Sequence, residues 1–334
     1  MLSRVAANLY WFGRYTERTE DTARLIRVNT QLLLDLPKGI SPGWRPLLEI
    51  MGARDAFDAR YQDSTERNAL RFLIGEPTNS SSILSSVRAA RENVRTMRDY
   101  LPRETWEQVN ELYLYARDKL PDGLSKHGRH EYLDQIIKQV QGIAGLLGGA
   151  MSHDRGFVFL RSGRHIERAD MTSRIIDVRS ASLLSNAPSE IKSYDNVQWM
   201  SVLKSLTAYQ MYRRTMQSRV QRSAVLAFLL KDPSFPRAIN YSLAAVAGGL
   251  DRLPHNEAPL REVGRARRLV DAADVHKLSQ EELHRFIDEF QIALGDVHNA
   301  IAATYFDVPF DPPAPPEPAA QSQEQTQTAA APAA

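Results

Sequence analysis

Two stretches of this 334-residue chain repeat each other. The segment GRYTERTEDTARLIRV begins at Gly13, and GRHIERADMTSRIIDV begins 150 residues later at Gly163. Both contain Gly-Arg-x-x-Glu-Arg, followed by an arginine and a valine at the same offsets. Repetition on this scale indicates that the fold is built from two copies of one structural unit.

The spacing of apolar residues predicts what that unit is made of. Large apolar side chains recur every three or four residues, as at Val5, Leu9 and Phe12, and no convincing alternation of the kind that strands show is present. Segments rich in proline and glycine, such as 36–43 and 120–128, interrupt the pattern. We predict an all-α protein with about ten to twelve helices.

The repeat extends beyond the quoted motif. Trp44 and Trp199 follow it in the same order, and each half then reaches a Leu-Pro break. Two copies are fewer than a stacked solenoid generally needs. We therefore predict a multi-helix bundle built from two duplicated helical units, about 1–150 and 151–306, in a pseudo-twofold arrangement.

One helical domain is expected to span 1–310. Residues 311–334 are rich in proline, glutamine and alanine and contain no aromatic or large aliphatic side chain. Such a segment cannot bury enough apolar surface to offset the entropy lost on ordering. It is predicted to be a disordered C-terminal tail.

The repeated motif places charged and apolar residues on one stripe of each helix, at about 100° per residue. The first stripe contains Tyr10, Arg14, Glu17, Asp21, Arg24 and Val28, and the second Leu160, Arg164, Glu167, Met171, Arg174 and Val178. Arg18 and Arg168 lie just to one side. Charges in line with apolar residues are unusual on a solvent face, so the stripe is predicted to face a groove between helices.

Three hypotheses explain such a stripe. Glu17 and Glu167 could form structural ion pairs with Arg14 and Arg164, or with arginines of the other repeat, because a stranded buried charge costs about 3–5 kcal/mol. The arginines could instead line a cleft that binds an acidic ligand. The glutamates could also act as general acids or bases. The candidate cleft residues are Arg14, Glu17, Arg18, Arg24, Arg164, Glu167, Arg168 and Arg174.

A second candidate patch lies in the segment SSSILSSVRAARENVRTMRDYL. Its arginines are spaced by three and four residues, which is typical of one helix face, whether solvated or ligand-binding. The serines at 80–82 suit a helix N-cap or an anion site equally well. The patch comprises Arg91, Glu92, Asn93, Arg95 and Arg98, together with Arg237 from a proline-flanked segment.

Composition and motifs exclude several functional classes. The net charge of +2 disfavours general binding of nucleic acids, although 34 of the 42 basic residues are arginine. The absence of cysteine excludes disulfides and thiolate metal sites, and no metal site is predicted. We find no nucleotide-binding or hydrolase motif. Without a signal or membrane-spanning segment, the cytoplasm is the expected location, with no membrane partner.

The opening MLSRVAANLYWFGRYTERTEDTARLIRV resembles that of the bacterial alpha-E domain family, which is named for a conserved Glu-Arg motif. SILSSVRAARENVRTMRDYL and FLRSGRHIERADMTSRIIDV fit the same family in the same order. The resemblance covers about 1–306. Ser80 and Ala238 depart from it, since the family tends to have proline and serine there.

The resemblance implies a role but no settled reaction. Family members look like companions of circularly permuted ATP-grasp ligases, in gene clusters that also hold transglutaminase-like peptidases. It implies an accessory or substrate-binding module that docks an ATP-grasp-type ligase, and possibly a transglutaminase-like protein, and holds a peptide or amino-acid ligand. No cofactor of its own is expected, because any ATP would be used by the partner. A stand-alone enzyme using Glu17 and Glu167, and a purely structural scaffold, are the alternatives.

Overall fold

The computed structural model describes residues 2–35, 43–181 and 195–307. Across these three ranges the chain is all-α, with fifteen α-helices, one 3-10 turn and no strand. The all-α prediction is therefore confirmed, but the predicted number of helices was too low. The additional helices are short, and one of them forms inside 120–128, which proline and glycine had marked as a break. The predicted tail, 311–334, lies outside the described residues.

The described residues of the first half, 2–35 and 43–150, form eight α-helices and the 3-10 turn. In order, they are α1 (Ser3–Asp35), α2 (Arg45–Ile50), α3 (Arg54–Asp58), α4 (Glu66–Ile74), α5 (Ile83–Arg95), η1 (Arg98–Tyr100), α6 (Arg103–Asp118), α7 (Leu120–Leu124) and α8 (Arg129–Ala150).

The second half forms seven α-helices within its described residues, 151–181 and 195–307. They are α9 (Arg155–Ala181), α10 (Asp195–Ser205), α11 (Tyr209–Met216), α12 (Arg222–Lys231), α13 (Ile239–Leu250), α14 (Glu257–Ala272) and α15 (Gln280–Tyr305).

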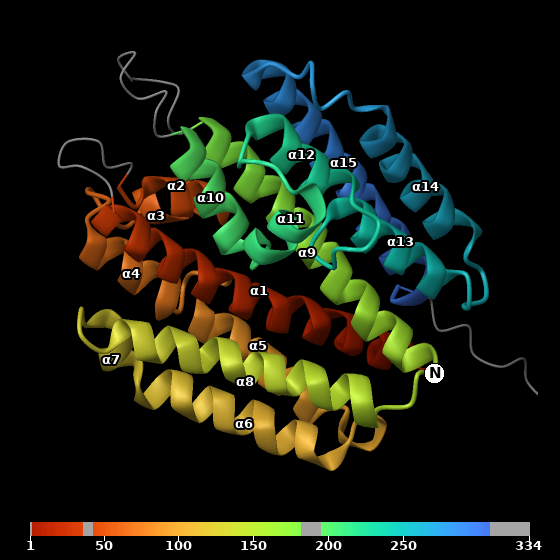
Figure 1. The fold of residues 1–334 in the computed structure, drawn as a ribbon. Helices are drawn as coiled ribbons and strands as arrows, with labels where there is room; N and C mark the ends of the chain where they lie inside the picture. The colour runs from red at the N-terminus through yellow and green to blue at the C-terminus, as the bar shows by residue number, and fades with distance from the viewer. Residues whose placement is uncertain (1, 36–42, 182–194, 308–334) are drawn as a thin grey trace, which may run out of the picture.

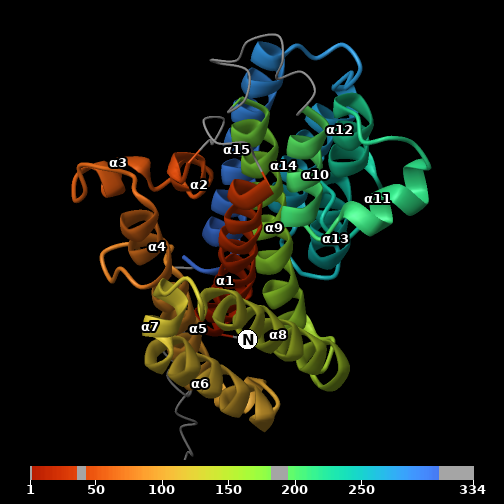
Figure 2. The ribbon, with the colours of Figure 1, turned by 60° about the vertical axis from the view of Figure 1, so that its left-hand side comes forward.

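Two long helices, α1 and α9, lie side by side at the centre of the molecule (Figure 1). On one side, α1 closes a four-helix bundle with α5, α6 and α8. On the other side, α9 closes a second bundle with α13, α14 and α15 (Figure 2). The contact between α1 and α9 therefore joins the two bundles, and the repeated motif lies along it.

The two halves share part of their arrangement. In both, a long helix packs against a shorter one that follows it, as α1 does against α5 and α9 against α13. Trp44 and Trp199, which are matching positions of the repeat, are both buried. This correspondence is what the predicted duplication requires. The duplication itself stays a prediction.

The start of α5 settles one of the sequence alternatives. The Ser82 hydroxyl accepts a hydrogen bond from the Ser85 N–H at 3.2 Å and donates one to the Glu76 carbonyl at 3.1 Å. Ser82 is buried and is the N-cap of this helix. The N-cap interpretation is therefore confirmed for Ser82.

Two glycines allow α1 and α9 to approach closely. A Cβ atom added to Gly13 would overlap the carbonyl oxygen of Leu160, and one added to Gly163 would overlap the carbonyl oxygen of Tyr10. Backbone therefore packs directly against backbone at the same position of each repeat. The sequence analysis gave these glycines no role, although a glycine inside a predicted helix in both copies was the available signal.

Gly13→Ala and Gly163→Ala are each expected to lower the free energy of unfolding by about 3 kcal/mol, because the added methyl group must force two backbones apart. The control is Gly145→Ala in α8, where a Cβ atom would meet nothing within 4 Å. That change should be neutral or stabilise by up to about 1 kcal/mol, since alanine is the better helix former. Urea denaturation measures all three variants. Equal stability of Gly13→Ala and Gly145→Ala would contradict the close crossing.

Candidate functional site

The glutamate of the second repeat is held by arginines of the first. Glu167, on α9, accepts hydrogen bonds from Arg14 Nε at 2.6 Å and from Arg18 Nε at 2.5 Å. Arg18 Nη2 adds a third bond at 3.0 Å. The Glu167 side chain is only 1% exposed, so its charge is neutralised almost entirely within the protein.

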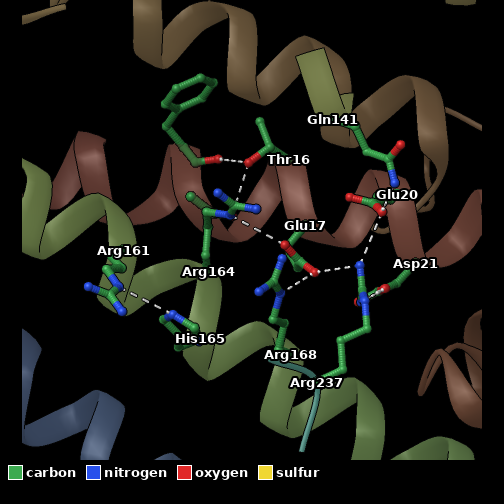
Figure 3. Close-up of polar contacts among 12 residues, drawn as sticks. Thr16, Glu17, Glu20, Asp21, Gln141, Arg161, Arg164, His165, Arg168 and Arg237 are labelled. Carbon is green, nitrogen blue, oxygen red and sulfur yellow. Dashed lines mark hydrogen bonds and ion pairs between the residues drawn. The ribbon is translucent and has the colours of Figure 1, made fainter. Parts of the chain in front are cut away.

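The glutamate of the first repeat makes the reciprocal contacts. Glu17, on α1, accepts from Arg168 Nε at 2.7 Å and from Arg164 Nε at 3.4 Å, and it is also 1% exposed (Figure 3). Of the two kinds of ion pair weighed for the stripe, the structure therefore forms those between repeats. The pairs within one repeat, Glu17 with Arg14 and Glu167 with Arg164, are not the ones that form.

Arg237 extends this network and corrects one sequence interpretation. It was grouped with the second patch, but it lies buried beside Glu17, just before α13 (Figure 3). Its guanidinium contacts Glu17 at 3.0 Å, Glu20 at 3.1 Å and Asp21 at 2.5 Å. The Thr172 hydroxyl donates to the Arg237 carbonyl at 3.0 Å, which anchors this segment to α9. The sequence could not predict these contacts, because Arg237 is far from α1 along the chain.

The last two predicted cleft arginines pair within their own helices. Arg24 is buried and contacts Glu20 at 2.6 Å, so it joins the network through that carboxylate. Gln141 on α8 also donates to Glu20, at 3.2 Å. Arg174 instead pairs with Asp170 at 2.9 Å and is not brought to Glu17 or Glu167. We call the following residues the Glu–Arg network: Arg14, Glu17, Arg18, Glu20, Asp21, Arg24, Arg164, Glu167, Arg168 and Arg237.

Burial and charge act in opposite directions on the two glutamates. Burial alone would raise the pKa of Glu17, but Arg168, Arg237 and Arg164 outweigh it and hold the pKa well below its usual range. At Glu167, Arg14 and Arg18 likewise outweigh burial and lower the pKa. Both glutamates are therefore ionised at neutral pH and poorly suited to donate a proton.

Asp21 differs from these glutamates. Burial, opposed by Arg237 and reinforced by Glu17 and Glu20, raises its pKa from 3.8 to about 7. Its Oδ2 atom is buried and has no hydrogen-bond partner among the described residues. A carboxyl in this setting can keep its proton near neutral pH. The sequence analysis put Asp21 on the stripe but did not select it as a site residue.

The second predicted patch forms a different surface. Arg98 lies 4.0 Å from the Trp106 ring centroid, and Arg91 lies between Trp106 and Tyr113, at 5.1 and 5.0 Å. The Arg117 guanidinium also lies over Tyr113, at 5.7 Å from its ring centroid. We call these five side chains the Arg–aromatic ladder. The sequence analysis missed its aromatic members, because they come from α6, whereas the patch was defined on one preceding helix; that segment forms α5 and then η1, which holds Arg98.

The other members of that patch surround the ladder. Arg95 pairs with Glu92 at 2.8 Å, and both side chains are about half exposed. Asn93 is half-buried in the same helix. Arg91 also donates from Nε to Asn110 at 2.8 Å. Five of the six predicted residues thus lie in α5 and the adjoining 3-10 turn, and only Arg237 lies elsewhere.

The described residues contain no group of three or more His, Asp or Glu side chains placed to hold a metal ion. None of the described helices is long and apolar enough to cross a membrane.

The fold and the network define a helical domain in which two Glu-Arg dipeptides, 17–18 and 167–168, pair across two central helices. The chain belongs to the Alpha-E family, whose model is described as "a predicted alpha-helical domain with a conserved ER motif" and matches residues 1–306. The family resemblance seen in the sequence is therefore confirmed.

Three relatives that match this chain are longer than it. An uncharacterized protein of Mycobacterium bovis is 23% identical over 340 residues, covering 92% of this chain and 37% of the relative. Uncharacterized proteins of two Mycobacterium tuberculosis strains match over the same shares, at 23% and 22% identity. The chain thus spans well under half the length of these relatives. No solved structure matches it significantly.

Asp21→Asn should change how stability depends on pH. In the native protein the Asp21 carboxyl binds its proton more tightly than in the unfolded chain, so its contribution is complete below the unfolded pKa of 3.8 and is lost as pH rises through about 7. The slope is at most about 1.4 kcal/mol per pH unit. Glu17 has a lowered pKa and stays ionised across this range. The Asp21→Asn variant should not show the loss of stability that Asp21 causes as pH rises.

Urea denaturation of both proteins between about pH 5 and pH 8 measures the difference. The stability of Asp21→Asn relative to the native protein should rise with pH. A difference that stays constant over this range would show that Asp21 does not titrate there. Glu107→Gln, at a side chain 58% exposed, is the control and should give a constant difference.

Proposed function

We propose that this protein is an accessory helical module with no chemistry of its own, which works in the cytoplasm with an ATP-grasp-type ligase and holds an ionised peptide or amino-acid ligand. The observation that carries the proposal is the reciprocal pairing of Glu17 and Glu167 with arginines of the opposite helix. This pairing engages the two carboxylates that would otherwise be the first candidates for catalysis.

A catalytic role for the glutamates has less support. A general acid must carry a proton near the working pH and reach the substrate. Glu17 and Glu167 have lowered pKa values and are 1% exposed. The Glu–Arg network is better suited to fix the register of α1 against α9, because displacing either helix would strand several buried charges.

A ligand would also find limited access to the network. The side chains of Arg14, Arg18, Arg164 and Arg168 are between 12% and 22% exposed, and each directs Nε toward a glutamate. An ionised ligand could reach only the outer edges of these guanidinium groups. We therefore assign the network to the structural role and place ligand binding on another surface.

The length of the relatives favours a module that acts with other protein segments. The match occupies 37% of the Mycobacterium bovis relative, so that protein carries this kind of domain beside further sequence. The Arg–aromatic ladder is the surface we propose for docking. Arginine, tryptophan and tyrosine are the residues most enriched at the energetic centres of protein interfaces, and Arg98 and Arg117 are exposed here.

Affinity purification of the tagged protein from its own cells at low ionic strength tests the proposal. Mass spectrometry should identify an ATP-grasp-type ligase among the co-eluting proteins. Arg98→Glu should remove it, because the change reverses an exposed charge on the ladder. Arg285→Glu, an exposed arginine of α15 on the other bundle, is the control and should retain it.

Recovery of no ATP-grasp-type ligase at native expression would contradict the proposed partnership. Equal recovery with Arg98→Glu and the native protein would contradict docking through the ladder. Circular dichroism of both variants excludes unfolding as the cause of any loss.

A further inference from the structure

Two neighbouring cavities lie away from the Glu–Arg network. One, of about 670 Å³, lies between the C-terminal part of α1, the start of α8 and the α10–α11 connection. The other, of about 840 Å³, lies between α4, α7 and the start of α8. Lys126 and Arg129 line both cavities, so the two adjoin. We call their combined surface the basic groove. Figure 1 shows α4, α7 and the start of α8 gathered at one end of the molecule.

Positive charge is distributed along the whole basic groove. Its lining includes seven arginine or lysine side chains: Arg27, Arg60, Arg67, Arg71, Lys126, Arg129 and Lys204. Among the described lining residues the carboxylates are only Glu66 and Glu76, both in the larger cavity. A groove lined mainly by one sign of charge concentrates ligands of the opposite sign.

The carboxylates near the groove are already engaged. Glu66 pairs with Arg129 at 2.8 Å, and Glu76 pairs with Arg60 at 3.1 Å. Asp134, behind the smaller cavity, pairs with Arg27 at 3.0 Å. Within the described residues, no carboxylate lies within ion-pair distance of the four remaining cations, which are Arg67, Arg71, Lys126 and Lys204. These side chains can accept an anionic ligand without breaking a pair.

Arg129 gives the groove a fixed cationic centre. Its side chain is only 5% exposed, and its guanidinium lies 5.9 Å from the Trp44 ring centroid. Its Nε atom is buried and has no hydrogen-bond partner among the described residues. A buried donor without a partner is costly, and the pair with Glu66 and the contact with Trp44 hold the guanidinium in place at the junction of the two cavities.

The groove also offers apolar contacts. Val28, Leu34 and Leu133 line the smaller cavity, and Leu120 and Leu124 line the larger one. Cations and apolar side chains line both of the adjoining cavities, which suits an extended chain better than a single compact anion. Each cavity alone has the volume typical of one small-molecule site.

We propose that the basic groove binds an acidic peptide in an extended conformation, with a carboxylate of the peptide at the Lys126–Arg129 junction. Arg27 and Lys204 contact its acidic side chains on one side of the junction, and Arg67 and Arg71 contact them on the other. The inference rests on the proposed function, because it names the class and the site of the ligand that the module holds.

Fluorescence anisotropy of a fluorescein-labelled hexaglutamate peptide, titrated with the full-length protein at low ionic strength, tests this site. Hexaglutamate should bind, and the matched hexaglutamine peptide should bind at least about tenfold more weakly. Lys126→Glu and Lys204→Glu reverse exposed charges outside the Glu–Arg network. Each should weaken hexaglutamate binding about tenfold, and Arg285→Glu should leave it unchanged.

Three results would overturn the proposal. The first is no binding of hexaglutamate, the second is binding of hexaglutamate to the Lys126→Glu variant as tightly as to the native protein, and the third is binding of inorganic triphosphate at the groove without binding of hexaglutamate. This experiment involves no ligase, and Arg98→Glu is expected to bind hexaglutamate normally. Failure of the groove and failure of ligase docking are therefore separate results.

Discussion

Two buried glutamates on neighbouring helices can stay ionised only if cations reach them. Glu17 and Glu167 meet this requirement reciprocally, each through arginines of the other repeat. The pairing works only at one register of α1 against α9, and Gly13 and Gly163 permit that register by letting the two backbones touch. The two four-helix bundles are positioned by the same contact, since each contains one of these central helices.

The network is reciprocal but not symmetric. Arg237 adds a third cation beside Glu17 and connects it to Glu20 and Asp21. Glu167 has no matching third arginine within ion-pair distance in the described parts of the chain. Its partner Arg14 instead lies over the Trp11 ring, at 5.4 Å from the centroid. The two halves thus share one pairing scheme while differing around it.

The local sequence pattern predicted the helices better than it predicted which distant side chains contact each other. The helical period and the buried stripe follow from residues a few positions apart, so the all-α class and the burial of Glu17 and Glu167 could be predicted. The position of Arg237 could not, because it lies 216 residues from Asp21 and depends on how α13 packs on α9. The basic groove was also missed, since four separate segments supply its cations and none carries a recognisable motif.

A double-mutant cycle on Arg18 and Glu167 measures the interaction on which this account rests. Glu167→Gln alone should destabilise the protein by about 3–5 kcal/mol, and the coupling energy with Arg18→Gln should be about 2 kcal/mol or more. The exposed pair Arg103–Glu107, at 3.3 Å, is the control and should show coupling below about 1 kcal/mol. Additive effects of Arg18→Gln and Glu167→Gln, within about 0.5 kcal/mol, would contradict the claim that this pairing locks the two central helices together.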